Sequence, residues 1–193
     1  MKRAGFALIA TLLMACSPPA ANDAAEHGTT ESADIPSPIT AGCTAQASHD
    51  WSAVGSQYYM IEAEARGDTC GAAVATIRIE SRDGATLFTR DYPIRDVPLA
   101  FNPNGDQTSL RSDIEGWITN TADPATADTL PAWPSGASKP PGFEPAVPRN
   151  RYESARGAQG PLFCFPDGGE SNACIAMDGD HATFLGSLTP ERS

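Results

Sequence analysis

Positively charged residues are scarce in this chain. It has 193 residues, of which 13 are Lys or Arg and 24 are Asp or Glu, so its formal net charge at pH 7 is −11. The basic residues form neither a run nor a basic helix face, which argues against nucleic acid as a partner because phosphate binding needs clustered Lys and Arg. The acidic excess favours solubility and would steer a cationic partner toward the protein.

Short catalytic and metal-binding motifs are also missing. The sequence contains no Gly-x-Ser-x-Gly elbow, no His-Glu-x-x-His helix, no Ser-x-x-Lys, no phosphate-binding glycine loop and no dinucleotide fingerprint. It has no Cys-x-x-Cys pair of the kind that binds structural zinc. We therefore predict no cofactor and no catalytic, cofactor-binding or metal-binding residues. Because catalytic groups can assemble from distant positions, His49 and His181 remain candidates in principle for a hydrolase.

Long apolar runs are confined to the N-terminus. Lys2 and Arg3 precede an uncharged run over residues 4–14, which has the length of the core of a secretion signal and is too short to span about 30 Å of hydrocarbon. No later segment of the sequence is long and apolar enough to predict a transmembrane helix. The start of the chain is therefore predicted to direct export.

The end of this run carries a resemblance to a known class of protein. Leu13-Met14-Ala15-Cys16 resembles the lipobox of bacterial lipoproteins, in which a signal peptidase cuts before a lipid-carrying cysteine. The resemblance implies that residues 1–15 are a cleaved signal peptide and that Cys16 carries acyl chains that fix the protein to a membrane. Ser17 at the sorting position implies the outer membrane rather than the inner one. The residues leave open a plain secretory signal with an incidental cysteine, or an apolar N-terminal helix of a cytosolic protein.

Residues 16–42 are predicted to form the lipidated N-terminus and a disordered stalk. After the cysteine this segment is rich in Pro, Ala, Ser and Thr, and it has acidic residues but no Lys or Arg. Such a composition cannot bury enough apolar surface to offset the entropy of ordering. As a flexible coil, the stalk would hold the folded domain on the order of 30 Å from the membrane.

The four cysteines after Cys16 are an even set, which predicts two disulfides in an oxidising compartment. Four cysteines allow three connectivities. The turn-rich segment PDGGESN lies between Cys164 and Cys174 and would bring their strands side by side, so we predict that these two pair. By elimination, Cys43 pairs with Cys70. Each bond would contribute about 2 to 4 kcal/mol to stability.

Hydrophobic periodicity predicts an α+β fold. Alternating residues predict strands at 59–66, 72–80 and 85–92, with a tight turn at Asp83-Gly84, and a helix at 108–118 follows them. Three more strands, 162–165, 173–177 and 181–188, form a predicted C-terminal β-meander after a short helix at 151–158. The predicted fold class is a small antiparallel sheet with one packed amphipathic helix and a C-terminal β-meander, stapled by disulfides. The apolar stripe of the longer helix is assigned to the core, and it consists of Leu110, Ile114, Trp117 and Ile118.

The segment 121–150 is rich in proline and has no convincing period. It is either a long surface excursion or a linker between two lobes, since structureless stretches of this length are unusual inside a compact domain. Its aromatic residues, Trp133 and Phe143, are expected to pin it to the domain surface rather than to serve a partner. The domain plan is then an α+β region at 43–120, this excursion or linker, and a meander at 151–193 that belongs to the same domain.

Two clusters of polar residues are considered as candidate metal-binding or catalytic sites. Asn102, Asn104, Asp106 and Asp113 have the spacing of a calcium loop, but the turn glycine and the long bidentate glutamate are absent, so a turn leading into a helix cap is the better interpretation. Asp178, Asp180 and His181 cluster at the predicted turn of the meander. Asp and Gly are also what a tight hairpin turn requires, so a structural role is favoured there.

The leading functional hypothesis is a noncatalytic, lipid-anchored protein of the bacterial cell envelope that binds or supports another envelope component. An inhibitor of a cationic hydrolase is the alternative, on the strength of the negative charge and of a loose analogy with lipid-anchored lysozyme inhibitors. A hydrolase that uses His49 or His181 is the third possibility. The predicted partners are the membrane, through Cys16, and an envelope protein.

Overall fold

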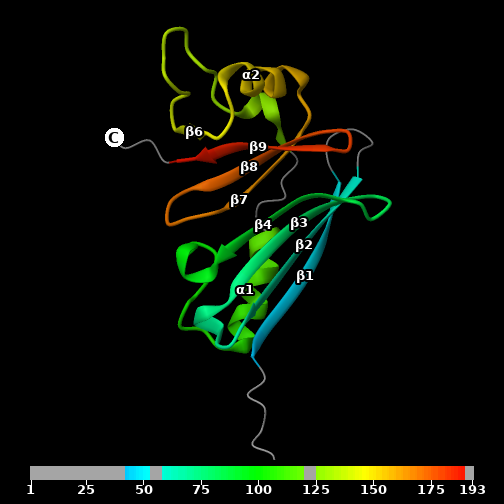
Figure 1. Ribbon diagram of the computed structural model, residues 1–193, viewed down its shortest axis with the longest axis vertical. Helices are drawn as coiled ribbons and strands as arrows, with labels where there is room; N and C mark the ends of the chain where they lie inside the picture. Colours follow the sequence, from blue (N-terminus) through cyan, green and yellow to red (C-terminus); the bar gives the residue numbers. More distant parts are fainter. Residues whose placement is uncertain (1–41, 53–57, 120–124, 190–193) are drawn as a thin grey trace, which may run out of the picture. The chain divides into compact units, whose positions relative to one another are not determined.

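The computed structural model describes residues 42–52, 58–119 and 125–189, and these residues form the α+β, disulfide-stapled fold that the sequence predicts (Figure 1). The predicted signal peptide, the lipobox with Cys16 and the stalk up to residue 41 lie outside this described part. No helix within the described ranges is long and apolar enough to cross a membrane.

Four antiparallel strands form a first sheet, which we call sheet A. They follow one another in the order β1-β2-β3-β4. The three strands expected from alternation are present, and an additional strand, β1, pairs with β2 over its whole length from Cys43↔Gly67 to Ser52↔Tyr58. The bounds are β1 Cys43–Ser52, β2 Tyr58–Gly67, β3 Val74–Ser81 and β4 Thr86–Pro93.

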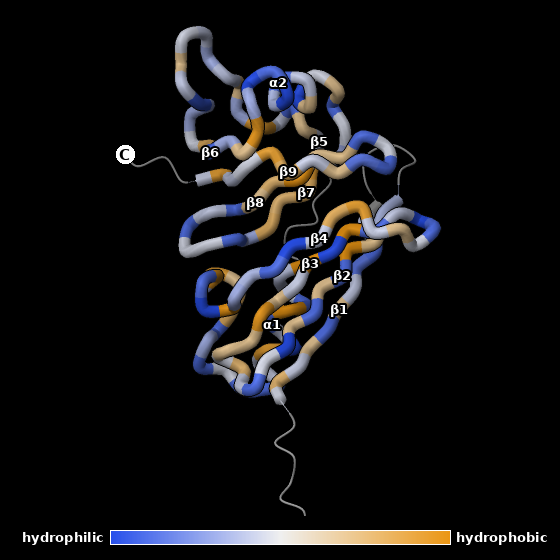
Figure 2. Tube along the Cα trace, in the orientation of Figure 1, coloured by the Kyte–Doolittle hydropathy of each residue, from blue (hydrophilic) through white to orange (hydrophobic). Residues whose placement is uncertain are grey.

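Alternation explains why these segments form strands. Along β2 and β3 buried residues alternate with half-exposed ones, and Ile61, Ile77 and Ile79 on the inner face are fully buried. Because side chains in a strand point alternately to opposite faces, the buried set falls on one side of sheet A. Figure 2 shows the same pattern as hydrophobic positions recurring along β2 and β3. Two short 3-10 helices flank β3 and β4, η1 at Cys70–Ala72 and η2 at Ile94–Asp96.

Helix α1, Gln107–Thr119, packs against sheet A, mainly against β1 and β2. Its predicted apolar stripe is buried, and Trp117 lies in the core as expected. Asp106 caps the helix, because its Oδ1 accepts the Ser109 N–H at 2.8 Å. This hydrogen bond lowers the pKa of the Asp106 carboxyl. In the segment with calcium-loop spacing, Asp113 Oδ2 accepts the Asn102 N–H at 2.9 Å, so this carboxylate serves the turn that leads into the helix.

The second sheet, sheet B, contains the predicted C-terminal meander and has the order β5-β7-β8-β9-β6. Its outer strands β5 and β6 come from the proline-rich segment, which also holds the 3-10 helix η3. The sequence-based expectation of no secondary structure there is wrong, because these short strands form by pairing with β7 and β9 at the edges of the sheet, where proline is tolerated. The bounds are β5 Ala125–Thr126, η3 Ala127–Thr129, β6 Phe143–Pro145, β7 Pro161–Pro166, β8 Asn172–Asp178 and β9 His181–Leu188.

Helix α2, Arg149–Ala158, covers the face of sheet B that is turned away from sheet A (Figure 1). It begins two residues before the predicted start at residue 151. Tyr152 of α2 and Phe143 of β6 are fully buried with ring centroids 5.1 Å apart, and the Trp133 ring lies 5.6 Å from that of Tyr152. The aromatic residues of the proline-rich segment therefore pin it to the domain, as predicted.

The two sheets share one hydrophobic core. Trp51 of β1 lies between Tyr59 and Phe163, with ring centroids 5.4 Å away in both cases. Trp117 of α1 contacts Phe165 of β7 at 5.5 Å. Its indole N–H donates to the carbonyl oxygen of the residue after Phe165 at 2.8 Å. Aromatic side chains from both sheets thus account for much of the buried surface between them.

Both disulfides have the predicted partners. Cys43–Cys70 ties the start of β1 to η1, and Cys164–Cys174 joins residues that lie directly opposite each other on β7 and β8. Each bond closes a loop within one sheet region rather than between the two sheets. The bonds therefore constrain local strand pairs, and the aromatic core joins the sheets.

Candidate functional site

A groove of about 430 Å³ lies between α2 and the β8–β9 hairpin. One wall is the face of α2 that carries Arg151 and Ser154, and the other is the end of β8 at Asp178 with Thr183 of β9. Small apolar side chains lie between the polar groups. The complete lining is Asn150, Arg151, Ser154, Ala155, Ala158, Ala176, Met177, Asp178 and Thr183.

Local sequence fixes the position of α2 above this groove. The helix ends at Ala158, and the C-cap residue Gln159 adopts a left-handed conformation with φ 54° and donates its N–H to Arg156 O at 3.2 Å. At the next residue, Gly160, an added Cβ would lie 2.0 Å from the Met177 carbonyl oxygen. Only glycine allows so close an approach of two backbones. The end of α2 is therefore held directly against β8.

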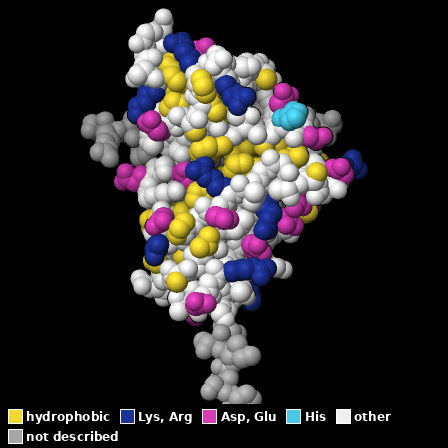
Figure 3. All heavy atoms as spheres, viewed as in Figure 1, with side chains coloured by type: hydrophobic (Ala, Val, Ile, Leu, Met, Phe, Trp, Pro, Cys, Tyr) yellow, Lys and Arg dark blue, Asp and Glu magenta, His cyan; other side chains and the backbone are white. Residues whose placement is uncertain are grey.

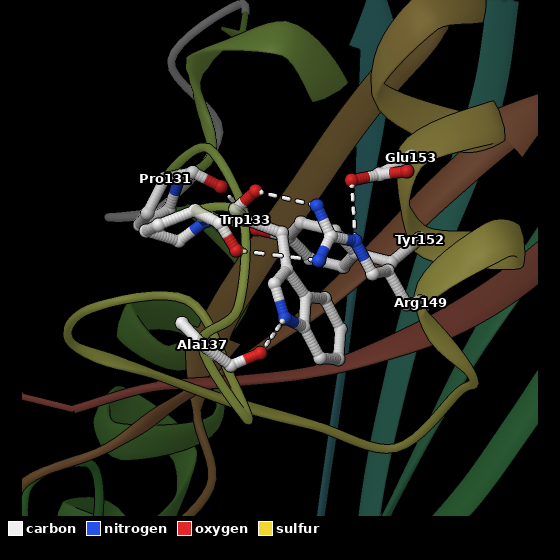
Figure 4. Close-up of polar contacts among 7 residues, drawn as sticks. Pro131, Trp133, Ala137, Arg149, Tyr152 and Glu153 are labelled. Carbon is white, nitrogen blue, oxygen red and sulfur yellow. Dashed lines mark hydrogen bonds and ion pairs between the residues drawn. The ribbon is translucent and has the colours of Figure 1, made fainter.

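The opposite side of α2 is occupied by the proline-rich segment. Arg149 donates to Trp133 O at 3.0 Å and pairs with Glu153 at 2.8 Å, and the Tyr152 hydroxyl donates to Pro131 O at 2.8 Å (Figure 4). Arg156 reaches the same segment further along the helix. Its guanidinium donates to the carbonyl oxygens of residues 130 and 128 at 2.9 and 3.1 Å. One face of α2 therefore binds the proline-rich segment, and the face that carries Arg151 lines the groove.

The groove combines a cation, an anion and an apolar floor. Arg151 and Asp178 are both exposed, and neither has a hydrogen bond or ion pair with another side chain in the described part of the chain. A guanidinium binds carboxylate or phosphate in a planar, two-pronged geometry. A carboxylate accepts from ammonium or hydroxyl groups. The arrangement suits a ligand that carries an acidic group, a hydrogen-bond donor and a short apolar part.

Of the three polar residues predicted to cluster at the meander turn, Asp178, Asp180 and His181, not all lie at the groove. Gly179 has φ +56°, and Asp178 and His181 face each other across the tight turn, so the structural role favoured from the sequence fits this geometry. Tyr59 of sheet A donates its hydroxyl to Gly179 O at 2.8 Å. Burial raises the pKa of Tyr59, and the carboxylates of Asp180 and Asp178 add to the effect. Only Asp178 lines the groove.

The two candidate histidines are not brought together with catalytic partners. His49 is half-buried on β1 of sheet A opposite Ile61, whereas His181 is exposed at the start of β9 in sheet B. Over residues 42–52, 58–119 and 125–189, neither imidazole is hydrogen-bonded to a hydroxyl or carboxylate. In the same ranges no three His, Cys, Asp or Glu side chains lie close enough together to hold a metal ion.

The α2 wall of the groove is not among the candidate site residues predicted from the sequence. Arg151, Ser154, Ala155 and Ala158 recur at helical spacing, which indicates one face of a helix. This spacing does not predict which other element of the fold lies next to that face of the helix. Figure 3 shows basic and acidic side chains interspersed over the visible face of the molecule, so charge alone does not mark the groove either.

No family model, curated protein or solved structure matches the chain. The interpretation of the groove therefore depends on its own geometry.

Proposed function

We propose that this protein is a lipid-anchored, noncatalytic binding protein of the bacterial cell envelope. The observation that carries the proposal is the pair of disulfides, Cys43–Cys70 and Cys164–Cys174. Such bonds persist in oxidising compartments outside the cytosol. The export signal and the lipobox-like residues that end at Cys16 indicate the same destination, and Ser17 favours the outer membrane over the inner one.

The groove supports a binding role for the folded domain. It offers Arg151 and Asp178 around an apolar floor, whereas the two histidines lie elsewhere. We assign the groove to the capture of a ligand or partner that presents an acidic group to Arg151. An inhibitor of a cationic hydrolase is the second candidate, favoured by the net charge of −11. Its complex would weaken steeply as salt is added, because screening shortens the range of charge attraction.

Lipid attachment is tested with a pair of neighbouring substitutions. Cys16→Ser should abolish incorporation of labelled fatty acid and release the protein from membrane fractions. Ser17→Asp should leave the lipid in place and move the protein from the outer to the inner membrane fraction. An unlipidated, full-length precursor in the reducing cytosol would contradict the proposal.

Partner binding is tested by photo-crosslinking in intact envelopes. A crosslinker at Ser154 in the groove should capture a defined molecule, and the same crosslinker at Glu170, an exposed residue of the β7–β8 loop, should not. Arg151→Glu should remove the captured product. Equal capture at both positions would exclude the groove as the binding site. A turnover activity lost in His49→Ala or His181→Ala would instead favour the hydrolase hypothesis.

A further inference from the structure

Strand β1 is an open edge of sheet A. It is ten residues long, it pairs with β2 without any bulge, and it contains no Pro, Lys or Arg. Natural proteins usually protect edge strands with such residues, with bulges or with a covering element, because an exposed edge is a template for another strand. In Figure 1, β1 forms one margin of sheet A; helix α1 packs against β1, but no described strand pairs with its outer edge.

The opposite edge of the same sheet is protected in several ways. Strand β4 carries Arg90 and ends at Pro93, and the register between β3 and β4 shifts at a bulge. Strand β9 of sheet B lies beside β4, where the Arg90 guanidinium stacks 4.4 Å from the centroid of the Phe184 ring. The β4 edge is therefore blocked, whereas among the described residues β1 is covered by α1 but has no strand paired with its outer edge.

One side chain reveals which main-chain groups of β1 face outward. The Thr44 N–H donates to Gln107 Oε1 at 3.1 Å, and the Gln107 side-chain amide donates to Thr44 O. Both main-chain groups of Thr44 therefore point away from β2. Because the hydrogen-bonding direction alternates along an antiparallel strand, the main-chain groups of Gln46, Ser48 and Asp50 point the same way. Within the described residues these groups have no main-chain partner on that side.

We propose that the β1 edge pairs with the β1 edge of a second copy of this chain, in antiparallel register about a two-fold axis at Ser48. The Gln107 side chain already binds the outward main-chain groups of Thr44, so pairing is confined to residues 46–50. With the axis at Ser48, Ser48 lies opposite Ser48 of the second copy, and Gln46 lies opposite Asp50 of the second copy.

This register matches an amide with a carboxylate and places no like charges opposite each other. It joins two four-stranded sheets into one continuous sheet, as an isologous two-fold interface requires. The inference does not depend on the membrane anchor, so it is tested on full-length mature chain carrying Cys16→Ser and exported to an oxidising compartment.

The first experiment uses cysteine crosslinking along one face of β1. Ser48→Cys should form a disulfide-linked dimer, because the two residues would lie directly opposite with Cα atoms about 5.5 Å apart. Gln46→Cys is the matched control on the same exposed face. Its counterpart would lie four residues away, roughly 13 Å, so it should stay monomeric. Equal crosslinking of both variants, or none with Ser48→Cys, would overturn the proposal.

The second experiment introduces the same charge at two positions and measures dimerisation by sedimentation equilibrium. Ser48→Arg places two like charges opposite each other and should weaken the dimer by about 1.5- to 5-fold. Gln46→Arg places a new charge opposite Asp50 on both sides of the axis, and the two pairs together should strengthen the dimer by about 2- to 30-fold. Circular dichroism checks that both variants fold. Equal effects of the two variants, a chain that stays monomeric, or pairing of β1 with a different protein instead would each refute pairing between copies.

Discussion

Removing the side-chain hydroxyl should have opposite effects on stability at two buried tyrosines. Tyr92 and Tyr152 are both buried, and burial raises the pKa of each hydroxyl to about 12. The Tyr152 hydroxyl donates to Pro131 O at 2.8 Å. The Tyr92 hydroxyl is buried without a hydrogen-bond partner in the described part of the chain. The Tyr92 ring keeps edge-to-face contacts with Trp117 and Phe165, both at 5.7 Å, whether or not the hydroxyl is present.

Removing the two hydroxyls one at a time should therefore change the free energy of unfolding in opposite directions. An unpaired buried polar group costs about 1 to 3 kcal/mol, so Tyr92→Phe should raise the free energy of unfolding by about 1 to 2 kcal/mol once a small void is allowed for. Tyr152→Phe breaks a hydrogen bond and orphans a carbonyl, and it should lower that free energy by about 1 to 2 kcal/mol. Urea unfolding followed by tryptophan fluorescence, with the disulfides intact, measures both values. Equal destabilisation by the two variants would refute the argument, because it would mean that Tyr92 has a partner.

Three further predictions concern stability. Since the pKa of both tyrosines is raised from 10 to about 12, their contribution to stability should be constant below pH 10 and should fall as the pH rises toward 12, which denaturant midpoints at pH 9 and 11 would detect. Removing Cys43–Cys70, with a sequence separation of 27, should cost about 3.6 kcal/mol, and removing Cys164–Cys174, with a separation of 10, about 2.7 kcal/mol; equilibrium unfolding of the two double Ala variants would give the order. Gly160→Ala should destabilise the protein in thermal unfolding because a Cβ would clash with the β8 backbone, whereas Gly157→Ala, with open space around it in α2, should stabilise it by up to about 1 kcal/mol.

Local signals were enough to predict most of the regular structure. Strands β2 and β3 alternate clearly, α1 has a capped apolar stripe, and the segment between Cys164 and Cys174 is rich in turn residues. Each of these features is encoded within about ten neighbouring residues. The fold class and the disulfide partners follow from them without any knowledge of long-range contacts.

The missed elements lack such a local signal. Most of the inward side of β1 is Ala45, Ala47 and His49, which is too weakly apolar to stand out as a buried face. Strands β5 and β6 are only two and three residues long and exist because they pair with β7 and β9. The groove likewise needs α2 and β8 to meet, so only Asp178, which also belongs to a turn, could be noticed in advance. Long-range pairing, rather than local propensity, decided these parts of the structure.

The placement of the two candidate surfaces determines which substitutions can separate them. The groove belongs to sheet B and α2, whereas the open edge belongs to sheet A, so Arg151→Glu and Ser48→Arg each alter one surface without touching residues of the other. Asp178 is a poorer choice than Arg151 for probing the groove. It precedes Gly179, whose carbonyl accepts the Tyr59 hydroxyl from β2, so a change at Asp178 would disturb a contact between the sheets as well as the ligand site. If Arg151→Glu abolished dimerisation, or Ser48→Arg abolished capture at Ser154, the two surfaces would not be independent and a single site spanning both sheets would have to replace them.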